Sequence, residues 1–337
     1  MAPAQEANTP PEWSDEALIA AEDARVKEER RRSASWRERI EREFRAIMAM
    51  KRIPFTTDEP MSGPAPYSWA DLKKPLLRKC PFELKDIRWL KHLGGGMDGY
   101  CWKVAFGDQG PFVVKMFWDH EPEENMNPWS AQRECQNAAV LQMIEASLGD
   151  LGDGDGQTSS IRVFTEPING DEAIENLYAF SQEARKKPRI QVDPEITHTL
   201  DSMIKTRKCF GWMKLSGAYF AARRGVRPPS LRIGKYRRGP TETGLEYFAI
   251  VYEYIEPQQG DDDPKCVDLE GIQASMDFLW TVGFEFSDTR ILDNWKGGVL
   301  IDLSDIVFPL GCGTSSRHDR GCAKSLQKAG KIFGNPY

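Results

Sequence analysis

Apolar residues recur at helical spacing near the start of the chain and predict one long helix over residues 14–50. Ser14 can cap this helix, and the acidic residues that follow it suit the positive end of the helix dipole. Its apolar face carries Trp36, Ile40, Phe44, Ile47 and Met48. The opposite face is rich in Arg and Glu. We expect the helix either to dock its apolar face on the main domain or to bind a protein partner through Trp36, Ile40 and Phe44, as in a coiled coil; its run of three arginines at 30–32 is alternatively a nuclear-localisation patch.

Residues 54–80 break the periodic pattern. Pro54, Pro60, Pro64 and Pro66 lie here among Thr, Ser and Gly, and proline interrupts both helices and central strands. The pattern predicts an N-terminal helical extension over residues 1–53 and a Pro-rich linker over 54–80.

Alternating apolar residues then predict three strands at Ile87–Leu93, Tyr100–Phe106 and Pro111–Phe117, with a Gly-containing turn before the third. A helix follows, capped by Asn127 and extending to about Leu148.

Further along, strands are predicted at Phe210–Phe220 and Tyr247–Ile255, with residues 161–205 left unassigned. Asp268 is expected to cap a helix that Gly283 ends, and an apolar strand, Val299–Asp302, follows a glycine turn.

Composition limits the classes of function. The 337 residues are 40% hydrophobic and 28% charged, which is typical of a globular protein, and the net charge of -6 argues against a general nucleic-acid binder. No apolar run is long enough to span a membrane. Seven scattered cysteines with no CxxC pair predict a reducing compartment, nuclear or cytoplasmic. Cys312, His318 and Cys322 lack a fourth ligand at a spacing typical of zinc sites, so we reject zinc there.

The segment Arg223–Arg238 holds seven basic residues and no acidic one. It is either an exposed loop, balanced by the acidic run at residues 261–263, or a surface for an acidic or nucleic-acid partner or for nuclear import.

The candidate chemistry centres on Lys115, a charge within an apolar strand that is costly to bury without a partner. Gly94, Gly96 and Gly99 match GxGxxG, but a strand follows them where a dinucleotide-binding fold requires a helix. A glycine loop between strands, then a strand lysine, then a helix with Glu134 is the order found in the nucleotide-binding half of protein kinases.

Four stretches strengthen this resemblance: LKHLGGGMDGYCWKV, VVKMFW, QRECQNAAVLQMIE and NWKGGVLIDLSDIV. Over roughly residues 82–308 the chain resembles the protein-kinase-like fold, and its motifs are similar to a fungal kinase-like family named after a subunit of the kinetochore Sim4 complex. The resemblance implies an α+β fold. An antiparallel-sheet N-lobe with one key helix and a long insertion would occupy residues 81–255, and a shortened helical C-lobe and tail would occupy 256–337.

The resemblance also implies roles for individual residues. The three glycines would close backbone amides over ATP phosphates, Lys115 would bind the α and β phosphates, and Glu134 would pair with Lys115. The remaining assignments are adenine binding by Glu253, Tyr254 and Ile255, Mg²⁺ binding by Asn294 and Asp302, and a catalytic role for Asp288.

Departures from the kinase pattern point to a degenerate, pseudokinase-type domain. Phe286-Ser287 replaces the catalytic His-Arg pair, and Leu303-Ser304 replaces Phe-Gly. Only 35 residues follow Asp302, too few for a full helical lobe. Three functions remain open: ATP–Mg binding with residual phosphoryl transfer, a non-catalytic kinetochore or chromatin scaffold, and a small-molecule kinase.

Overall fold

The computed structural model describes residues 15–150, 160–239, 242–256, 268–286 and 294–312. Its contacts divide the chain into two units, Met1–Met50 and Lys51–Tyr337, which we treat separately. The first unit is formed by helix α1 (Asp15–Lys51), as the sequence predicts, although Ser14 lies outside the described residues. Exposed pairs such as Arg25–Glu22, at 2.7 Å, join neighbouring turns of α1.

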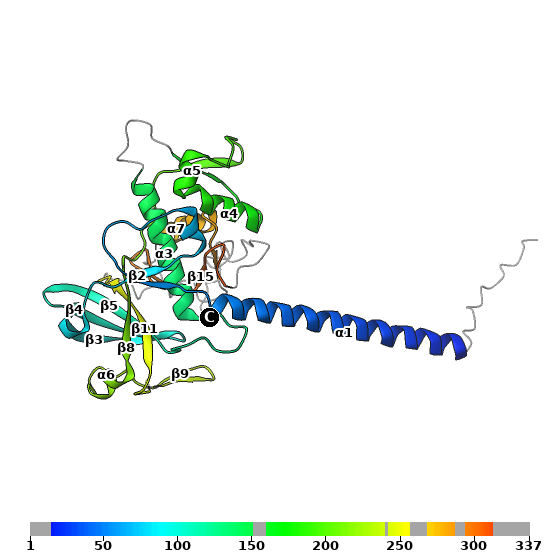
Figure 1. The fold of residues 1–337 in the computed structure, drawn as a ribbon, viewed down its shortest axis with the longest axis horizontal. Coiled ribbons are helices and arrows are strands. Elements are labelled where there is room, and N and C mark those ends of the chain that lie inside the picture. The colour runs from blue at the N-terminus through cyan, green and yellow to red at the C-terminus, as the bar shows by residue number, and fades with distance from the viewer. Residues whose placement is uncertain (1–14, 151–159, 240–241, 257–267, 287–293, 313–337) are drawn as a thin grey trace, which may run out of the picture. The chain divides into compact units, whose positions relative to one another are not determined.

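The second unit is built on a seven-stranded mixed sheet in the order β1-β2-β8-β11-β5-β4-β3 (Figure 1). Its strands are β1 (Thr56–Pro60), β2 (Leu77–Lys79), β3 (Ile87–Gly95), β4 (Gly99–Phe106), β5 (Gln109–Phe117), β8 (Cys209–Ser216) and β11 (Glu246–Glu253). The pairs from β3 through β4, β5 and β11 to β8 are antiparallel, and β2 joins β8 and β1 in parallel.

Four two-stranded ribbons complete the described strands. They are β6 (Ile161–Phe164) with β7 (Thr197–Leu200), β9 (Leu231–Ile233) with β10 (Tyr236–Arg238), β12 (Glu285–Phe286) with β15 (Ile306–Val307), and β13 (Trp295–Lys296) with β14 (Val299–Leu300).

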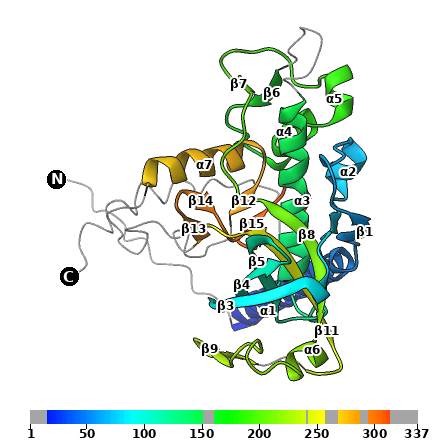
Figure 2. The same cartoon turned by 90° about the vertical axis from the view of Figure 1, so that its left-hand side faces the viewer.

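Helix α3 (Ser130–Gly149) lies along one face of the sheet, as Figures 1 and 2 show from two sides. The other helices of this unit are α2 (Trp69–Lys73), α4 (Gly170–Ala179), α5 (Gln182–Lys186), α6 (Gly217–Ala221) and α7 (Leu269–Thr281), with a 3-10 turn at Leu84–Asp86. The described chain thus combines seven α-helices with a large mixed sheet, which agrees with the predicted α+β class. None of these helices is long and apolar enough to cross a membrane.

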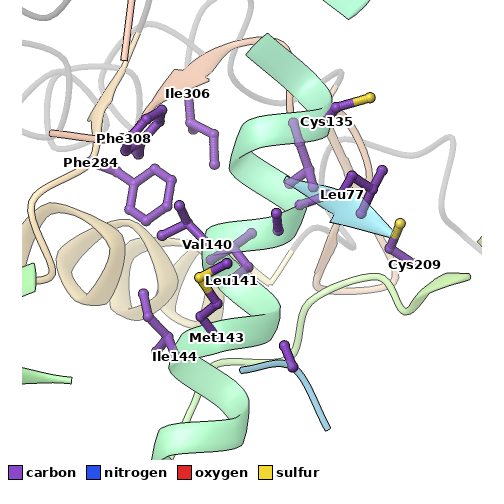
Figure 3. Packing of buried hydrophobic residues seen from close by; sticks show 14 of the residues in the cluster. Leu77, Cys135, Val140, Leu141, Met143, Ile144, Cys209, Phe284, Ile306 and Phe308 are labelled. Carbon is purple, nitrogen blue, oxygen red and sulfur yellow. The ribbon is translucent and has the colours of Figure 1, made fainter. Parts of the chain in front are cut away.

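Alternation along β5 explains the two cores. Val113 and Phe117 face the cluster around α3, whereas Val114 and Met116 face the opposite cluster. Figure 3 shows the first cluster, in which the apolar side of α3 meets β2, β8 and the segments that carry Phe284 and Phe308. Lys115 shares the α3 face, so the pleat itself aims its ammonium at the helix.

The prediction that residues 54–80 form a linker is wrong. This segment supplies strands β1 and β2 of the main sheet and the helix α2, whose Ser68 and Asp71 form a capping box. Leu72 and Leu77 are completely buried. The prolines misled because β1 is an edge strand and Pro60 is its last residue, where a missing N–H costs little.

Several predicted boundaries also move. Helix α3 begins at Ser130 rather than beside Asn127, because buried Trp129 precedes it and donates from Nε1 to the Asp119 carbonyl, at 3.0 Å. The strand expected at Phe210–Phe220 ends at Ser216, whose hydroxyl accepts from the Tyr219 amide and caps α6.

The predicted ends of the helix after residue 267 are confirmed, and two segments left without a fixed structure contain defined elements. Asp268 caps α7 through the Gly271 amide at 2.9 Å, and Gly283 follows the helix with φ 98°. The unassigned stretch 161–205 contains β6, α4, α5 and β7, and the basic segment 223–238 contains the β9–β10 ribbon rather than loop alone.

If residues 54–80 belong to the folded core, truncating Leu77 must destabilise the whole domain. We expect Leu77→Ala to lower the free energy of unfolding by about 2–5 kcal/mol, because it leaves a cavity at a completely buried position. Its neighbour Leu76 is 36% exposed, so Leu76→Ala is a matched control with a much smaller effect. Urea unfolding measures both, and equal small effects would restore the linker interpretation.

Candidate functional site

The ion pair expected between Lys115 and Glu134 is present. Lys115, on β5, places its Nζ 2.6 Å from Oε2 of Glu134, on α3, and both side chains are buried. The Tyr252 hydroxyl donates to the other carboxylate oxygen, Oε1, at 2.9 Å. Burial raises the pKa of Glu134 to about 7, and the Lys115 ammonium opposes that rise.

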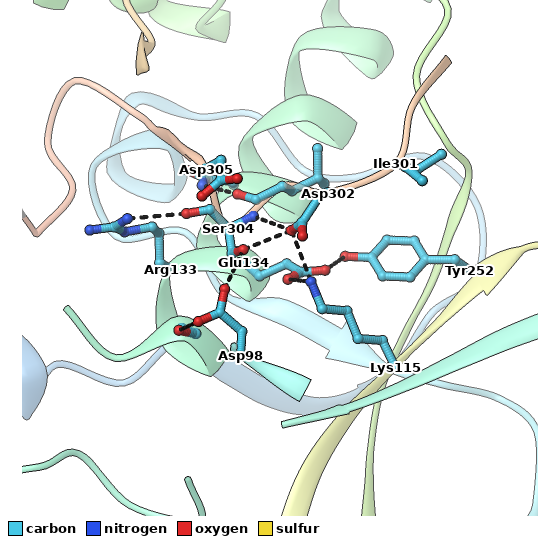
Figure 4. Close-up of polar contacts among 12 residues, drawn as sticks. Asp98, Lys115, Arg133, Glu134, Tyr252, Ile301, Asp302, Ser304 and Asp305 are labelled. Atoms are coloured by element: carbon cyan, nitrogen blue, oxygen red, sulfur yellow. Dashed lines mark hydrogen bonds and ion pairs between the residues drawn. The ribbon is translucent and has the colours of Figure 1, made fainter. Parts of the chain in front are cut away.

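A second carboxylate completes the environment of Lys115. Asp302 Oδ1 lies 2.9 Å from Nζ, although the two residues are 187 positions apart in the sequence (Figure 4). Burial alone would lower the pKa of Lys115, but Asp302 and Glu134 raise it well above its usual value. Burial likewise acts to raise the pKa of Asp302, yet Lys115 and Ser304 lower it to about 2.

Helix α3 also holds the chain around Asp302 in place. Arg133 donates to the carbonyl of Ser304 at 3.1 Å, and the buried Asn137 amide donates to the carbonyl of Leu303 at 2.8 Å. The amide of Phe308 donates back to Asn137 Oδ1 at 3.2 Å. Leu303 is buried in the α3 cluster, so an apolar side chain follows the aspartate despite the change from phenylalanine.

The glycine turn between β3 and β4 is tied to the same segment. Asp98, within the turn, has one carboxylate oxygen 2.7 Å from the Ser304 hydroxyl and the other 2.6 Å from the Ser130 hydroxyl. Gly94 has φ 117°, a conformation that side chains disfavour, and a Cβ on Gly99 would come 2.2 Å from the Met116 carbonyl oxygen. These two positions therefore require glycine.

A cavity of about 450 Å³ opens beside these groups. The glycine turn, Lys115 and Asp302 all line it. The rest of the lining consists of Leu93, Cys101, Val113, Arg207, Tyr254, Ile255, Lys296 and Ile301. Its size falls in the range usual for small-molecule sites.

The predicted adenine-binding segment is only partly at the cavity. Tyr254 and Ile255 line it, but Glu253 does not. The Glu253 amide donates to the Lys208 carbonyl at 2.9 Å, and its carbonyl accepts from Arg207 Nε at 3.0 Å. Both backbone groups of Glu253 are thus already engaged within the fold, because Glu253 still belongs to the paired end of β11.

Of the residues predicted to bind metal or to act in catalysis, the structure describes Asn294 and Asp302 but not Asp288. The side-chain amide nitrogen of Asn294 donates to Asp305 Oδ2 at 2.9 Å. The side-chain oxygen of Asn294 takes no part in this contact. The described residues contain no group of three or more His, Cys, Asp or Glu side chains arranged to hold a metal. Asp288 lies outside the described residues.

Sequence reasoning missed several residues of the site. Asp98 could have been found from the sequence, because it is the one acidic residue within the glycine turn. Nothing in the sequence indicated that Arg207 belongs to the site, because Arg207 follows the stretch 161–205, to which no helix or strand was assigned. Its guanidinium joins the Glu253 carbonyl to that of Ile301, at 3.0 and 3.1 Å.

Comparison with known proteins adds no identity: no protein-family model matches this sequence, and no curated protein sequence matches it significantly.

The lowered pKa of Asp302 predicts a specific loss of stability in acid. The native pKa of about 2 is below the ordinary 3.8, so the unfolded chain binds more protons in this interval. The stabilisation from Asp302 is full above pH 3.8 and is lost as the pH falls towards 2. We expect wild type to exceed Asp302→Asn in unfolding free energy near neutral pH, and this advantage to shrink in acid. Urea unfolding across the acid range tests it, and a constant difference would refute it.

Proposed function

We propose that residues of roughly 82–308 form a kinase-like domain that binds ATP with Mg²⁺ and is degenerate in its catalytic part. One observation supports this most strongly. The glycine turn, the Lys115–Glu134 pair, Asp302 and part of the predicted adenine segment meet around one cavity, although they come from distant parts of the chain. The proposal also includes membership of the Sim4-complex-like kinase family, whose motifs the sequence resembles.

The turn has the properties of a phosphate cradle. The amides of Met97 and Asp98, at its tip, donate to no acceptor among the described residues. A Cβ added at Gly94 or Gly96 would meet no atom within 4 Å, so open space lies next to this backbone. Unpaired amides beside a buried ammonium suit the oxygens of a phosphate group.

The apolar part of the cavity lining suits a flat, mostly apolar ring. Leu93, Val113 and Ile255 supply aliphatic surface, and Tyr254 adds an aromatic side chain. A lining that combines charged groups with aliphatic and aromatic side chains matches a nucleotide better than it matches a small polar metabolite.

Mg²⁺ fits the oxygen groups on the phosphate side. Every hydrogen bond between the Asp302 carboxylate and the described residues uses Oδ1, so Oδ2 remains for a ligand. The kinase pattern would add the amide oxygen of Asn294, although Asn294 is not among the described residues that line the cavity. Carboxylate and amide oxygens, completed by water and phosphate, are the usual surroundings of Mg²⁺, which would neutralise phosphate charge there.

The proposal concerns binding in the first place. Transfer of the phosphoryl group would need a base to orient the acceptor, and Asp288 is the residue the kinase pattern assigns to that role. Its neighbours Phe286-Ser287 replace the usual His-Arg pair, which favours a domain that retains the nucleotide site and has lost efficient catalysis.

Removing the Lys115 ammonium should weaken the binding of the phosphates without affecting the binding of the adenine base. We expect Lys115→Met to weaken ATP–Mg binding by about tenfold or more, the equivalent of one charged hydrogen bond. Adenosine lacks phosphates, so its affinity should hardly change. Titration calorimetry with both ligands measures this on protein whose circular dichroism confirms folding.

Two further variants separate a lost ligand contact from lost folding. Lys91→Met removes an exposed lysine of β3 and should bind ATP–Mg like wild type. Gly96→Val adds a side chain where nothing lies within 4 Å, so it should preserve stability and still weaken ATP binding. Wild type that binds neither ATP–Mg nor adenosine would eliminate the proposal.

The acidic side chains beside the cavity predict dependence on a divalent cation. Without Mg²⁺, the charges of Asp98 and Asp302 repel a polyphosphate, so chelation by EDTA should weaken ATP binding by about tenfold or more. Asp98→Asn keeps an acceptor for Ser304 and should reduce that ratio. Asp108→Asn, in the exposed turn between β4 and β5, is the control and should leave the ratio unchanged. An equal ratio in wild type and Asp98→Asn would argue against this role of Asp98.

A further inference from the structure

The segment of residues 223–238, here called the basic arm, concentrates unpaired positive charge. Six of its seven basic side chains are exposed and form no ion pair with any described residue: Arg223, Arg224, Arg227, Arg232, Lys235 and Arg237. The seventh, Arg238, pairs with Asp119 at 2.9 Å. In a chain of net charge -6 this local excess is distinct from the general surface.

The β9–β10 ribbon makes part of this charge hard to explain by folding alone. Arg232 and Arg237 are directly opposite each other in the antiparallel register, so their side chains share one face. Like charges in this position destabilise a pair of strands, and a two-stranded ribbon is marginal by itself. An anionic group bound between the two guanidinium groups would remove the repulsion.

The arm is nevertheless anchored. Trp102 Nε1 donates to the Val226 carbonyl at 3.0 Å, and His92 Nε2 lies 2.8 Å from the Gly225 carbonyl oxygen. Leu231 packs so closely on the glycine turn that a Cβ on Gly95 would come 2.8 Å from its Cδ1. The arm is therefore held beside β3 and β4, but none of its residues lines the nucleotide-sized cavity.

We propose that the basic arm binds an extended, acidic polypeptide segment. The carboxylates of such a segment can pair with Arg232 and Arg237. Its backbone can add a third strand to the ribbon, because β9 and β10 pair only with each other in the described structure.

Nucleic acid fits these observations less well. Binding to single strands relies on aromatic side chains that stack on bases, and Tyr236 is the arm's only aromatic residue. The net negative charge of the chain opposes a long polyanion more than a short acidic peptide. Peptide binding by the arm does not require ATP binding, because the arm and the cavity share no residue.

The test is fluorescence anisotropy with a labelled, glutamate-rich peptide and with single- and double-stranded DNA of similar length. We expect the peptide to bind more tightly than either DNA, and its binding to weaken as salt rises. Arg232→Glu should weaken peptide binding at least about fivefold, because a repulsive charge replaces an attractive one.

Arg232→Glu also places opposite charges across the ribbon, facing Arg237. Its unfolding midpoint should therefore equal or exceed that of wild type, which separates a binding effect from misfolding. Arg30→Glu, on α1, makes the same change in net charge and should bind like wild type, as should Lys115→Met. The proposal fails if wild type does not bind the peptide, if DNA binds as tightly, or if Arg232→Glu and Arg30→Glu behave alike.

Discussion

The ammonium of Lys115 is buried on a sheet face that is otherwise apolar, and the arrangement around it depends on balancing that one charge. A buried cation without a partner costs several kcal/mol, so the fold must bring carboxylates to it. Glu134 comes from α3, and Asp302 comes from the segment after β14. The pair of contacts fixes the helix against the sheet and fixes a distant loop against both. Tyr252 then satisfies the remaining oxygen of Glu134.

The same charge balance separates two regions of the second unit. The carboxylates of Glu134 and Asp302 contact the Lys115 ammonium, and Asp302 and Asp98 of the glycine turn line the cavity. Unpaired cations gather outside it, on the basic arm. We propose a nucleotide with Mg²⁺ as the ligand of the first region and an acidic polypeptide segment as the partner of the second. The net charge of the chain does not show this separation, because it adds the negative charges of one region to the positive charges of the other.

Local patterns predicted the elements that local forces specify. Alternation located β3, β4 and β5, and the helical pattern that follows them located α3, which carries Glu134. Prediction failed where tertiary context overrides local preference. Residues 54–80 looked like linker because of their prolines, but Leu77 is completely buried and β2 pairs with β8. Helix α3 begins after Trp129 rather than beside Asn127, because the Trp129 indole is buried and donates to the carbonyl of Asp119, ten residues earlier.

By itself the sequence determined that Lys115 needed a partner, since a charge in an apolar strand is costly to bury, and the resemblance to protein kinases indicated Glu134 as that partner. It determined the glycine turn as well. Only the tertiary structure decided that Asp302 joins the pair, that Asp98 is bonded to Ser304, and that Glu253 is withheld from the cavity. These outcomes depend on contacts between residues far apart in the chain. Periodicity describes which face a residue occupies, but it carries no information about which distant segment that face will meet.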